Sequence, residues 1–123
     1  MNNRYEGLAG EEAACKYLTD KGYKILERNY ANKVGEIDII AQDKEYTVFV
    51  EVKTRSDDRY GYALEAVTPA KIAKIVRCAD WYLTVKRKTD SDVRFDVVCV
   101  GQNGVEHVVN AFTRLDAGRR NHW

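Results

Sequence analysis

The stretch from Gly35 to Arg55, GEIDIIAQDKEYTVFVEVKTR, constrains the fold most, because it holds two apolar segments joined by a short polar turn. β-Branched and aromatic residues are frequent in both segments, which is typical of a β-hairpin. The predicted strands cover residues 34–41 and 46–53, with the turn at residues 42–45. A hairpin of this composition belongs in a buried sheet, yet its strands also carry acidic residues and a lysine.

The other elements predicted from the sequence surround this hairpin. Apolar residues at helical spacing predict a helix from Tyr5 to about Lys21, and residues 22–30 have the pattern of a strand. Thr68-Pro69 is a typical helix start, so we expect a second helix that ends near Arg87. The positions that this helix should bury are Ile72, Ile75, Val76, Ala79 and Leu83.

Two more strands are predicted over residues 94–101 and 105–109, joined by a turn at Asn103-Gly104. The order α-β-β-β-α-β-β favours an α/β fold with one central mixed sheet flanked by helices. With 123 residues, 45% of them apolar, the chain suits a single domain. We place that domain at residues 1–113 and expect residues 114–123, RLDAGRRNHW, to form a loose basic tail.

Charge and cysteine content exclude several classes of protein. The 20 Lys and Arg residues nearly balance the 19 Asp and Glu residues, so the net charge of +1 gives no argument for an anionic partner. Cys15, Cys78 and Cys99 include no C-x-x-C pair, and we interpret them as core thiols rather than disulfide or zinc ligands. Because no apolar run approaches the roughly 18 residues of a membrane span, we expect a cytoplasmic protein without a membrane partner.

The strand pattern of the hairpin brings charged residues together. Side chains alternate along a strand, so Glu51 and Lys53 lie on the same face. A two-residue turn at Lys44-Glu45 would place Asp38 directly opposite Glu51 and Glu36 opposite Lys53. Directly opposed residues have Cβ atoms roughly 4.5–5.5 Å apart.

Two carboxylates at that separation repel each other by about 3 kcal/mol at an effective dielectric constant of ~20. A divalent cation such as Mg²⁺ would compensate, because it takes carboxylate oxygens, keeps several waters and binds phosphate oxygens in its remaining positions. A surface ion-pair network at the open end of the hairpin is the alternative interpretation. The pattern is therefore consistent with either a metal site or a solvated cluster of charges.

The first predicted helix adds a third carboxylate. Leu8, Glu11, Cys15 and Leu18 follow the spacing of one helical stripe, which places Glu11 on the apolar face. A carboxylate in that position needs a partner, and a metal or a lysine at the end of the sheet would be one. Three acidic groups and a lysine suit metal-assisted hydrolysis of a phosphodiester, since the metal lowers the pKa of a bound water and the ammonium stabilises the transition state.

Asp38, followed on the next strand by Glu51-x-Lys53, resembles the PD-(D/E)XK signature of the restriction-endonuclease-like fold. A wider set of blocks resembles the YraN family of predicted endonucleases, which is related to archaeal Holliday junction resolvases. These blocks are G-x-x-G-E in the first helix, GEIDIIA, VFVEVKTR, the Thr-Pro-Ala-Lys helix start and RFDVV. The resemblance covers residue 7 to about residue 113.

The resemblance implies roles for individual residues. Lys53 would position or activate the attacking water, and Glu36 would assist the site or pair with Lys53. Apart from the resemblance, the positions of Arg55 and Lys71 suit contact with a nucleic-acid backbone, with a solvated surface as the alternative, and Glu36 is grouped with them as a candidate at that surface. The implied ligands of Mg²⁺ or Mn²⁺ are Asp38, Glu51, Glu11 and the backbone carbonyl of Val52.

The implied function is metal-dependent cleavage of nucleic acid, in particular branched or unpaired DNA, and junction cleavage would favour a homodimer. One alternative is a module that binds nucleic acid in repair or recombination without cutting it. A second is a metal-dependent hydrolase of small phosphate esters, although the chain lacks a glycine-rich phosphate-binding loop.

Overall fold

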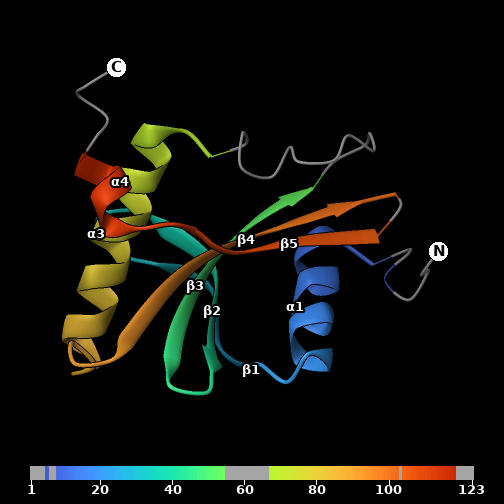
Figure 1. The fold of residues 1–123 in the computed structure, drawn as a ribbon, viewed down its shortest axis with the longest axis horizontal. Coiled ribbons are helices and arrows are strands. Elements are labelled where there is room, and N and C mark those ends of the chain that lie inside the picture. Colours follow the sequence, from blue (N-terminus) through green and yellow to red (C-terminus); the bar gives the residue numbers. More distant parts are fainter. Residues whose placement is uncertain (1–4, 6–7, 55–66, 103, 119–123) are drawn as a thin grey trace.

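A five-stranded mixed β-sheet with helices on both faces forms the protein, here described by a computed structural model (Figure 1). The structure describes residue 5 and residues 8–54, 67–102 and 104–118. Along the chain the elements are α1 (Gly10–Asp20), β1 (Lys24–Ala31), β2 (Glu36–Asp43), β3 (Tyr46–Thr54), α3 (Pro69–Val85), β4 (Asp92–Gly101), β5 (Gly104–Phe112) and α4 (Arg114–Gly118). This confirms the predicted order and fold class, which is compatible with a restriction-endonuclease-like fold.

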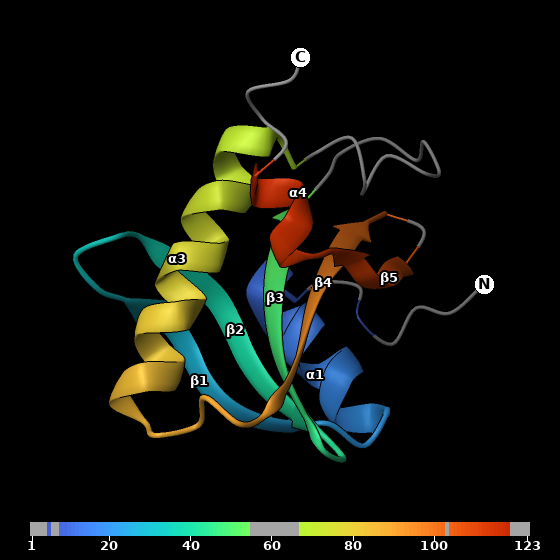
Figure 2. The same ribbon diagram turned by 60° about the vertical axis from the view of Figure 1, so that its left-hand side comes forward.

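The strands lie in the sheet in their chain order, β1-β2-β3-β4-β5. All neighbours are antiparallel except β3 and β4, which are parallel. Parallel neighbours need a crossover connection, and α3 lies in that connection. Figure 2 shows α3 and α4 on one side of the sheet and α1 on the other. No helix in the described ranges is long and apolar enough to cross a membrane.

The register of the central hairpin agrees with the prediction. A two-residue turn at Lys44-Glu45 places Asp43 opposite Tyr46, and the pairing continues to Ile39 opposite Val50. Lys44 has a φ of 56°, a left-handed conformation that suits a tight hairpin turn. This register directs Val50 toward the cluster that α1 covers and Phe49 toward the cluster that α3 covers.

Helix α3 begins where the sequence predicts and buries the predicted residues. The Thr68 hydroxyl accepts a hydrogen bond from the Lys71 amide at 3.2 Å, and Pro69 occupies the first helical position. All three cysteines are buried and free, which confirms their interpretation as core thiols. The residues predicted to be buried by α3, and found buried, are Ile72, Ile75, Val76, Ala79 and Leu83.

The start of the first helix differs from the prediction. Helix α1 begins at Gly10 instead of Tyr5, and Leu8 lies before the helix with 39% of its surface exposed. Tyr5 is nevertheless buried, and its hydroxyl donates a hydrogen bond to Asp20 at 3.1 Å. A segment that packs against its own helix produced the apolar periodicity that was interpreted as an extra helical turn.

The loose tail predicted from residue 114 is wrong for its first five residues, which form α4. Asp116 accepts a hydrogen bond from the Thr113 amide at 2.8 Å and so closes the first turn of this helix. The Arg114 guanidinium pairs with Asp80 on α3. Charged residues that the sequence analysis assigned to a solvated tail therefore attach α4 to the neighbouring helix.

Beneath α1, a buried polar network is centred on Asp96, which is fully inaccessible to solvent. Arg94 donates to both carboxylate oxygens of Asp96 at 3.0 Å, and it also donates to Asp43 at 2.9 Å and to the Tyr23 hydroxyl at 2.6 Å. His107 lies with its Nε2 2.8 Å from Asp96. The network connects β4 to the hairpin and to β5.

Asn110 completes this network through a β-bulge. The register between β4 and β5 shifts between Phe95 and Val97, and Asn110 adopts a φ of 56° in the shifted part of β5. Its amide donates to Asp96 at 3.0 Å. Burial alone raises the pKa of the Asp96 carboxyl, but the bonds from His107, Arg94 and Asn110 outweigh burial and hold that pKa below its usual value.

Gly10 brings the start of α1 into contact with the end of β3. A Cβ atom at Gly10 would lie 2.3 Å from the Oγ1 atom of Thr54 and 3.3 Å from its Cβ. Only a residue without a side chain fits at that distance. The N-terminus of α1 is therefore held one residue beyond Lys53 on the strand.

We expect Asp96→Asn to lower the free energy of unfolding by about 3 kcal/mol, because it removes the charge that compensates buried Arg94. Urea denaturation followed by circular dichroism measures the change. Asp92→Asn, at an exposed position of the same strand, is the control and should stay within about 0.5 kcal/mol of the wild type. Equal effects of the two substitutions would contradict a central role for the network.

The stability contributed by Asp96 should depend on pH in a defined window. A carboxyl whose folded pKa is lowered stabilises the fold above its unfolded pKa of about 3.9, and this contribution is lost as the pH falls through the lower folded value. The difference in stability between wild type and Asp96→Asn should narrow below about pH 4, as Asp96 becomes protonated. Urea titrations across this range test the prediction, and a gap that widened in acid would refute it.

Gly10→Ala should destabilise the protein by about 1–3 kcal/mol through overpacking against Thr54, although alanine normally favours a helix. Thr54→Ala should recover most of that loss in the double variant, because it removes the atom that lies closest. A double-mutant cycle in urea measures the coupling. Additive effects would show that the two residues do not interact.

Candidate functional site

A buried carboxylate with two ammonium partners lies at the end of β3. Glu51 has only 6% of its side-chain surface exposed, on the face of the sheet that α3 covers. The Lys53 Nζ atom is 3.6 Å from Glu51 Oε2, and the Lys71 Nζ atom is 3.5 Å from the same oxygen. Lys53 comes from the same strand and Lys71 from the first turn of α3. The predicted proximity of Glu51 and Lys53 is therefore confirmed.

Asp38 supplies the second carboxylate of this site. The β2–β3 pairing extends as far as Ile39 opposite Val50, so Asp38 follows immediately in the register that would oppose it to Glu51. Its Oδ2 atom accepts a hydrogen bond from the Val52 amide at 2.8 Å. This hydrogen bond joins the Asp38 side chain to β3 at Val52, the residue between Glu51 and Lys53.

The electrostatics of Glu51 reflect these neighbours. Burial raises the pKa of its carboxyl, and the nearby charge of Asp38 raises it further. The ammonium groups of Lys71 and Lys53 lower the pKa, but they do not cancel the first two effects. The ionised pair of carboxylates is therefore only partly compensated by the protein's own cations.

The residues of this site fit a divalent cation of the magnesium type. Mg²⁺ is held by one or two carboxylates and keeps several waters, so Asp38 and Glu51 supply a sufficient protein contribution. Across the described ranges, no group of three or more His, Cys, Asp or Glu side chains is placed to hold a metal together. The donor set is thus suited to Mg²⁺ or Mn²⁺ with open positions, and less so to a closed structural cage.

Glu11 reaches the same end of the sheet from the other side. Its helix covers the face that carries Val48 and Val50, whereas Glu51 points to the α3 face. Glu11 is partly buried in the first turn of α1, and its charge acts on Cys15 and Arg28. The structure therefore brings Glu11 near the end of β3 through Gly10, but among the described residues Glu11 does not join Asp38 and Glu51 in a group of three carboxylates that could hold one metal, because α1 covers the opposite face of the sheet.

The remaining candidates have different outcomes. Glu36 is exposed at the start of β2 and pairs in register with Ala31 of β1, and Lys53 has its ion pair with Glu51 instead. The Val52 carbonyl stays a predicted ligand. Arg55 lies outside the described residues. Lys71, predicted as a candidate contact for nucleic acid, lies 3.5 Å from the central carboxylate, and its contact with nucleic acid stays a prediction.

The sequence did carry a signal for Lys71. The first turn of α3 contains no acidic residue, although acidic residues are favoured at that end of a helix, and it contains a lysine instead. Such a departure from the usual helix pattern points to a role outside the helix. The contact itself depends on how the crossover places α3, which the sequence pattern does not specify.

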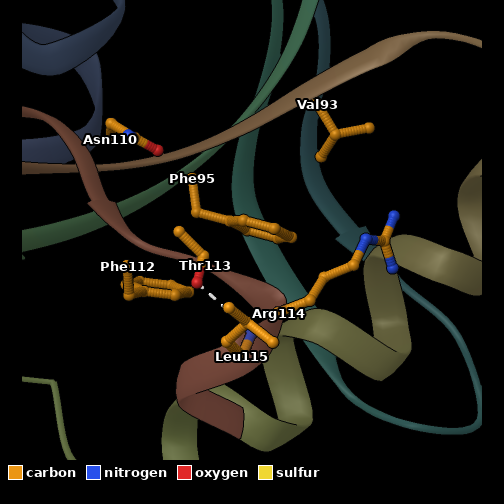
Figure 3. Close-up of a pocket in the computed structure, with 7 residues that line it drawn as sticks. All are labelled: Val93, Phe95, Asn110, Phe112, Thr113, Arg114 and Leu115. Carbon is orange, nitrogen blue, oxygen red and sulfur yellow. Dashed lines mark hydrogen bonds between the residues drawn. The ribbon is translucent and has the colours of Figure 1, made fainter.

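Two hollows on the surface lie away from Asp38 and Glu51. One cavity of about 280 Å³ lies between β4, β5 and α4, and Figure 3 shows its lining, in which Phe95 and Phe112 are prominent. A second hollow lies against α3 beside Trp81 and Val85. Neither contains Asp38 or Glu51, and the mainly apolar lining of each gives no set of groups for phosphate chemistry.

Comparison with known proteins defines the family. The model of an uncharacterised protein family, UPF0102, matches residues 10–100. A UPF0102 protein of Syntrophomonas wolfei is 45% identical over 114 residues, covering 89% of this chain and 99% of that protein. One of Clostridioides difficile is 44% identical over 114 residues, covering 91% and 100%, and one of Persephonella marina is 41% identical over 107 residues, covering 87% and 92%. These descriptions name no activity, and the chain belongs to the uncharacterised protein family UPF0102.

Proposed function

We propose that this protein is a metal-dependent endonuclease that hydrolyses phosphodiesters in nucleic acid, with structured or branched DNA as its substrate class. The observation that carries the proposal is the buried carboxylate of Glu51, which lies beside Asp38 and within 3.6 Å of two lysine ammonium groups. Buried carboxylates next to cations that can contact phosphate suit hydrolysis of an anionic ester. The resemblance to PD-(D/E)XK endonucleases gives independent support.

In the proposed mechanism each residue of the site has one task. Asp38 and Glu51 would hold Mg²⁺ or Mn²⁺, and the hydrogen bond from the Val52 amide fixes the orientation of Asp38. A metal held there would supply a bound water of lowered pKa and a positive charge beside the phosphate. Lys53, held beside Glu51 on the same strand, orients the attacking water or stabilises the transition state.

Access to the site favours a polymer as substrate. Lys53 and Lys71 keep 34% and 40% of their side-chain surface exposed, while Glu51 between them is buried. An extended phosphate backbone can approach exposed lysines at the end of a sheet without entering a closed pocket. The two hollows described above lie elsewhere and have mainly apolar linings.

The wild-type protein should cut at least one of four labelled DNAs, namely linear duplex, single strand, flap or four-way junction, when Mg²⁺ or Mn²⁺ is present. EDTA should abolish cutting, and Glu51→Gln or Lys53→Met should slow it by about 100-fold or more. Gel electrophoresis of the products measures the rates. Glu45→Gln and Lys44→Met, in the exposed hairpin turn, are matched controls that should cut at the wild-type rate.

Two results would overturn the nuclease proposal. Cutting that persists in Glu51→Gln and Lys53→Met would indicate a contaminating enzyme or another site. Metal-independent binding of one of these DNAs without any cutting would favour a module that acts in repair or recombination by binding alone.

A further inference from the structure

Lys71 contacts the site in a way that catalysis by Lys53 does not explain. Its Nζ atom is 3.5 Å from Glu51 Oε2, the same oxygen that Lys53 approaches at 3.6 Å. One carboxylate oxygen thus forms ion pairs with two ammonium groups that come from β3 and α3. A single lysine would already supply the positive charge that the PD-(D/E)XK signature requires.

Helix stability does not account for a lysine at this position. Lys71 lies in the first turn of α3, where the macrodipole disfavours positive charge. Its backbone is nevertheless well fixed, since the amide donates to the Thr68 hydroxyl at 3.2 Å. A lysine that weakens the helix end and has a fixed backbone is suited to deliver its side chain to the neighbouring site.

The two lysines reach Glu51 from different elements. Lys53 belongs to β3, where it pairs with Cys99 of β4 beyond the last β2 pair at Val50, and it lies two residues from Glu51 on the same face. Lys71 reaches Glu51 across the gap between helix and sheet, and its side chain is 40% exposed. A flexible four-carbon stem can move its ammonium by several ångströms without any change in the backbone.

A divalent cation bound to Glu51 would compete with these ammonium groups. The cation binds carboxylate oxygen at about 2.0–2.1 Å, and a positive charge a few ångströms away would oppose it. Lys71 reaches the carboxylate from a separate element, so its ammonium can leave Glu51 while β3 and Lys53 stay in place. Once released, it would lie beside a phosphate that the same cation contacts.

We propose that Lys71 takes the place of the metal at Glu51 in the metal-free protein, and that metal binding transfers its ammonium from the carboxylate to a phosphate of the nucleic acid. This inference rests on the proposed function. It assigns Lys71 as a positioning residue that couples metal binding to contact with a phosphate of the substrate. Removal of the Lys71 ammonium should therefore have two opposite effects. It should raise the affinity for the metal and lower the affinity for DNA.

The first measurement is Mn²⁺ affinity without DNA, followed by electron paramagnetic resonance of the free ion. Lys71→Met should bind Mn²⁺ more tightly than the wild type, on the order of 10-fold, because it removes a competing charge and keeps the side-chain volume. Lys71→Arg, which retains the charge, should stay close to the wild type. Lys74→Met, one turn further along α3 and exposed, is the matched control and should leave the affinity unchanged.

The second measurement is affinity for the DNA that is cut best, in a Lys53→Met background that prevents cleavage. Lys71→Met should weaken binding several-fold when Mn²⁺ is present and should have little effect in EDTA, where the ammonium remains on Glu51. A lysine with only a structural role would weaken metal and DNA binding together.

The outcomes separate this inference from the nuclease proposal. If the wild type binds Mn²⁺ in a manner that Glu51→Gln abolishes, but Lys71→Met binds it equally or more weakly, the exchange is wrong and the nuclease proposal stands. If the wild type binds no Mn²⁺ at Glu51, both are wrong. Thermal unfolding of each variant verifies that it is folded before either affinity is compared.

Discussion

The register between β2 and β3 is the constraint on which the rest of the structure depends. Side chains alternate along a strand, so a slip by one residue would exchange the two faces of the hairpin. Glu51 would then enter the apolar layer beneath α1, and Val50 would face α3. The tight turn at Lys44-Glu45 and the buried side chains on both faces prevent that slip, and they thereby fix Asp38 beside Glu51.

Asp96 and Glu51 show how differently one sheet can treat two buried carboxylates. They lie on neighbouring strands, since Val50 pairs with Asp96 and Glu51 pairs with Val97. Asp96 accepts bonds from Arg94, His107 and Asn110, and these bonds lower its pKa despite complete burial. Glu51 has a second carboxylate nearby and a raised pKa. The bonds to Asp96 thus outweigh the effect of burial on its pKa, whereas the two lysines beside Glu51 do not outweigh burial and the charge of Asp38.

Much of this arrangement could be predicted from local sequence. The hairpin turn gave the register, and the Thr68-Pro69 start gave the beginning of α3 and its buried positions. The predictions that failed or fell short depended on packing between distant elements. Helical periodicity placed Glu11 on an inward face, but it could not indicate that α1 covers the side of the sheet opposite Glu51. The contact of Lys71 with Glu51 likewise arises from the crossover through α3.

The partners of Asp96 were also beyond sequence reasoning, for a related reason. His107 pairs with Val98 in the regular part of β5, whereas the Asn110 amide reaches Asp96 only because the register shifts between Phe95 and Val97. In a sheet, an irregularity of one residue decides which side chains meet, and a pattern of alternating residues does not reveal it.

The charges around Glu51 and those around Arg94 lie on opposite faces of the sheet and have opposite effects on how the hairpin is held. The repulsion between Asp38 and Glu51 tends to separate β2 from β3 at the end of the sheet. On the α1 face, Arg94 of β4 bonds to Asp43 at the opposite end of β2, and β4 itself is paired with β3 along its length. This bond holds the hairpin in the sheet by a contact that is independent of the site. The repulsion at one end of the hairpin can therefore be tolerated, because the opposite end of β2 is tied to β4 through Arg94 and Asp43.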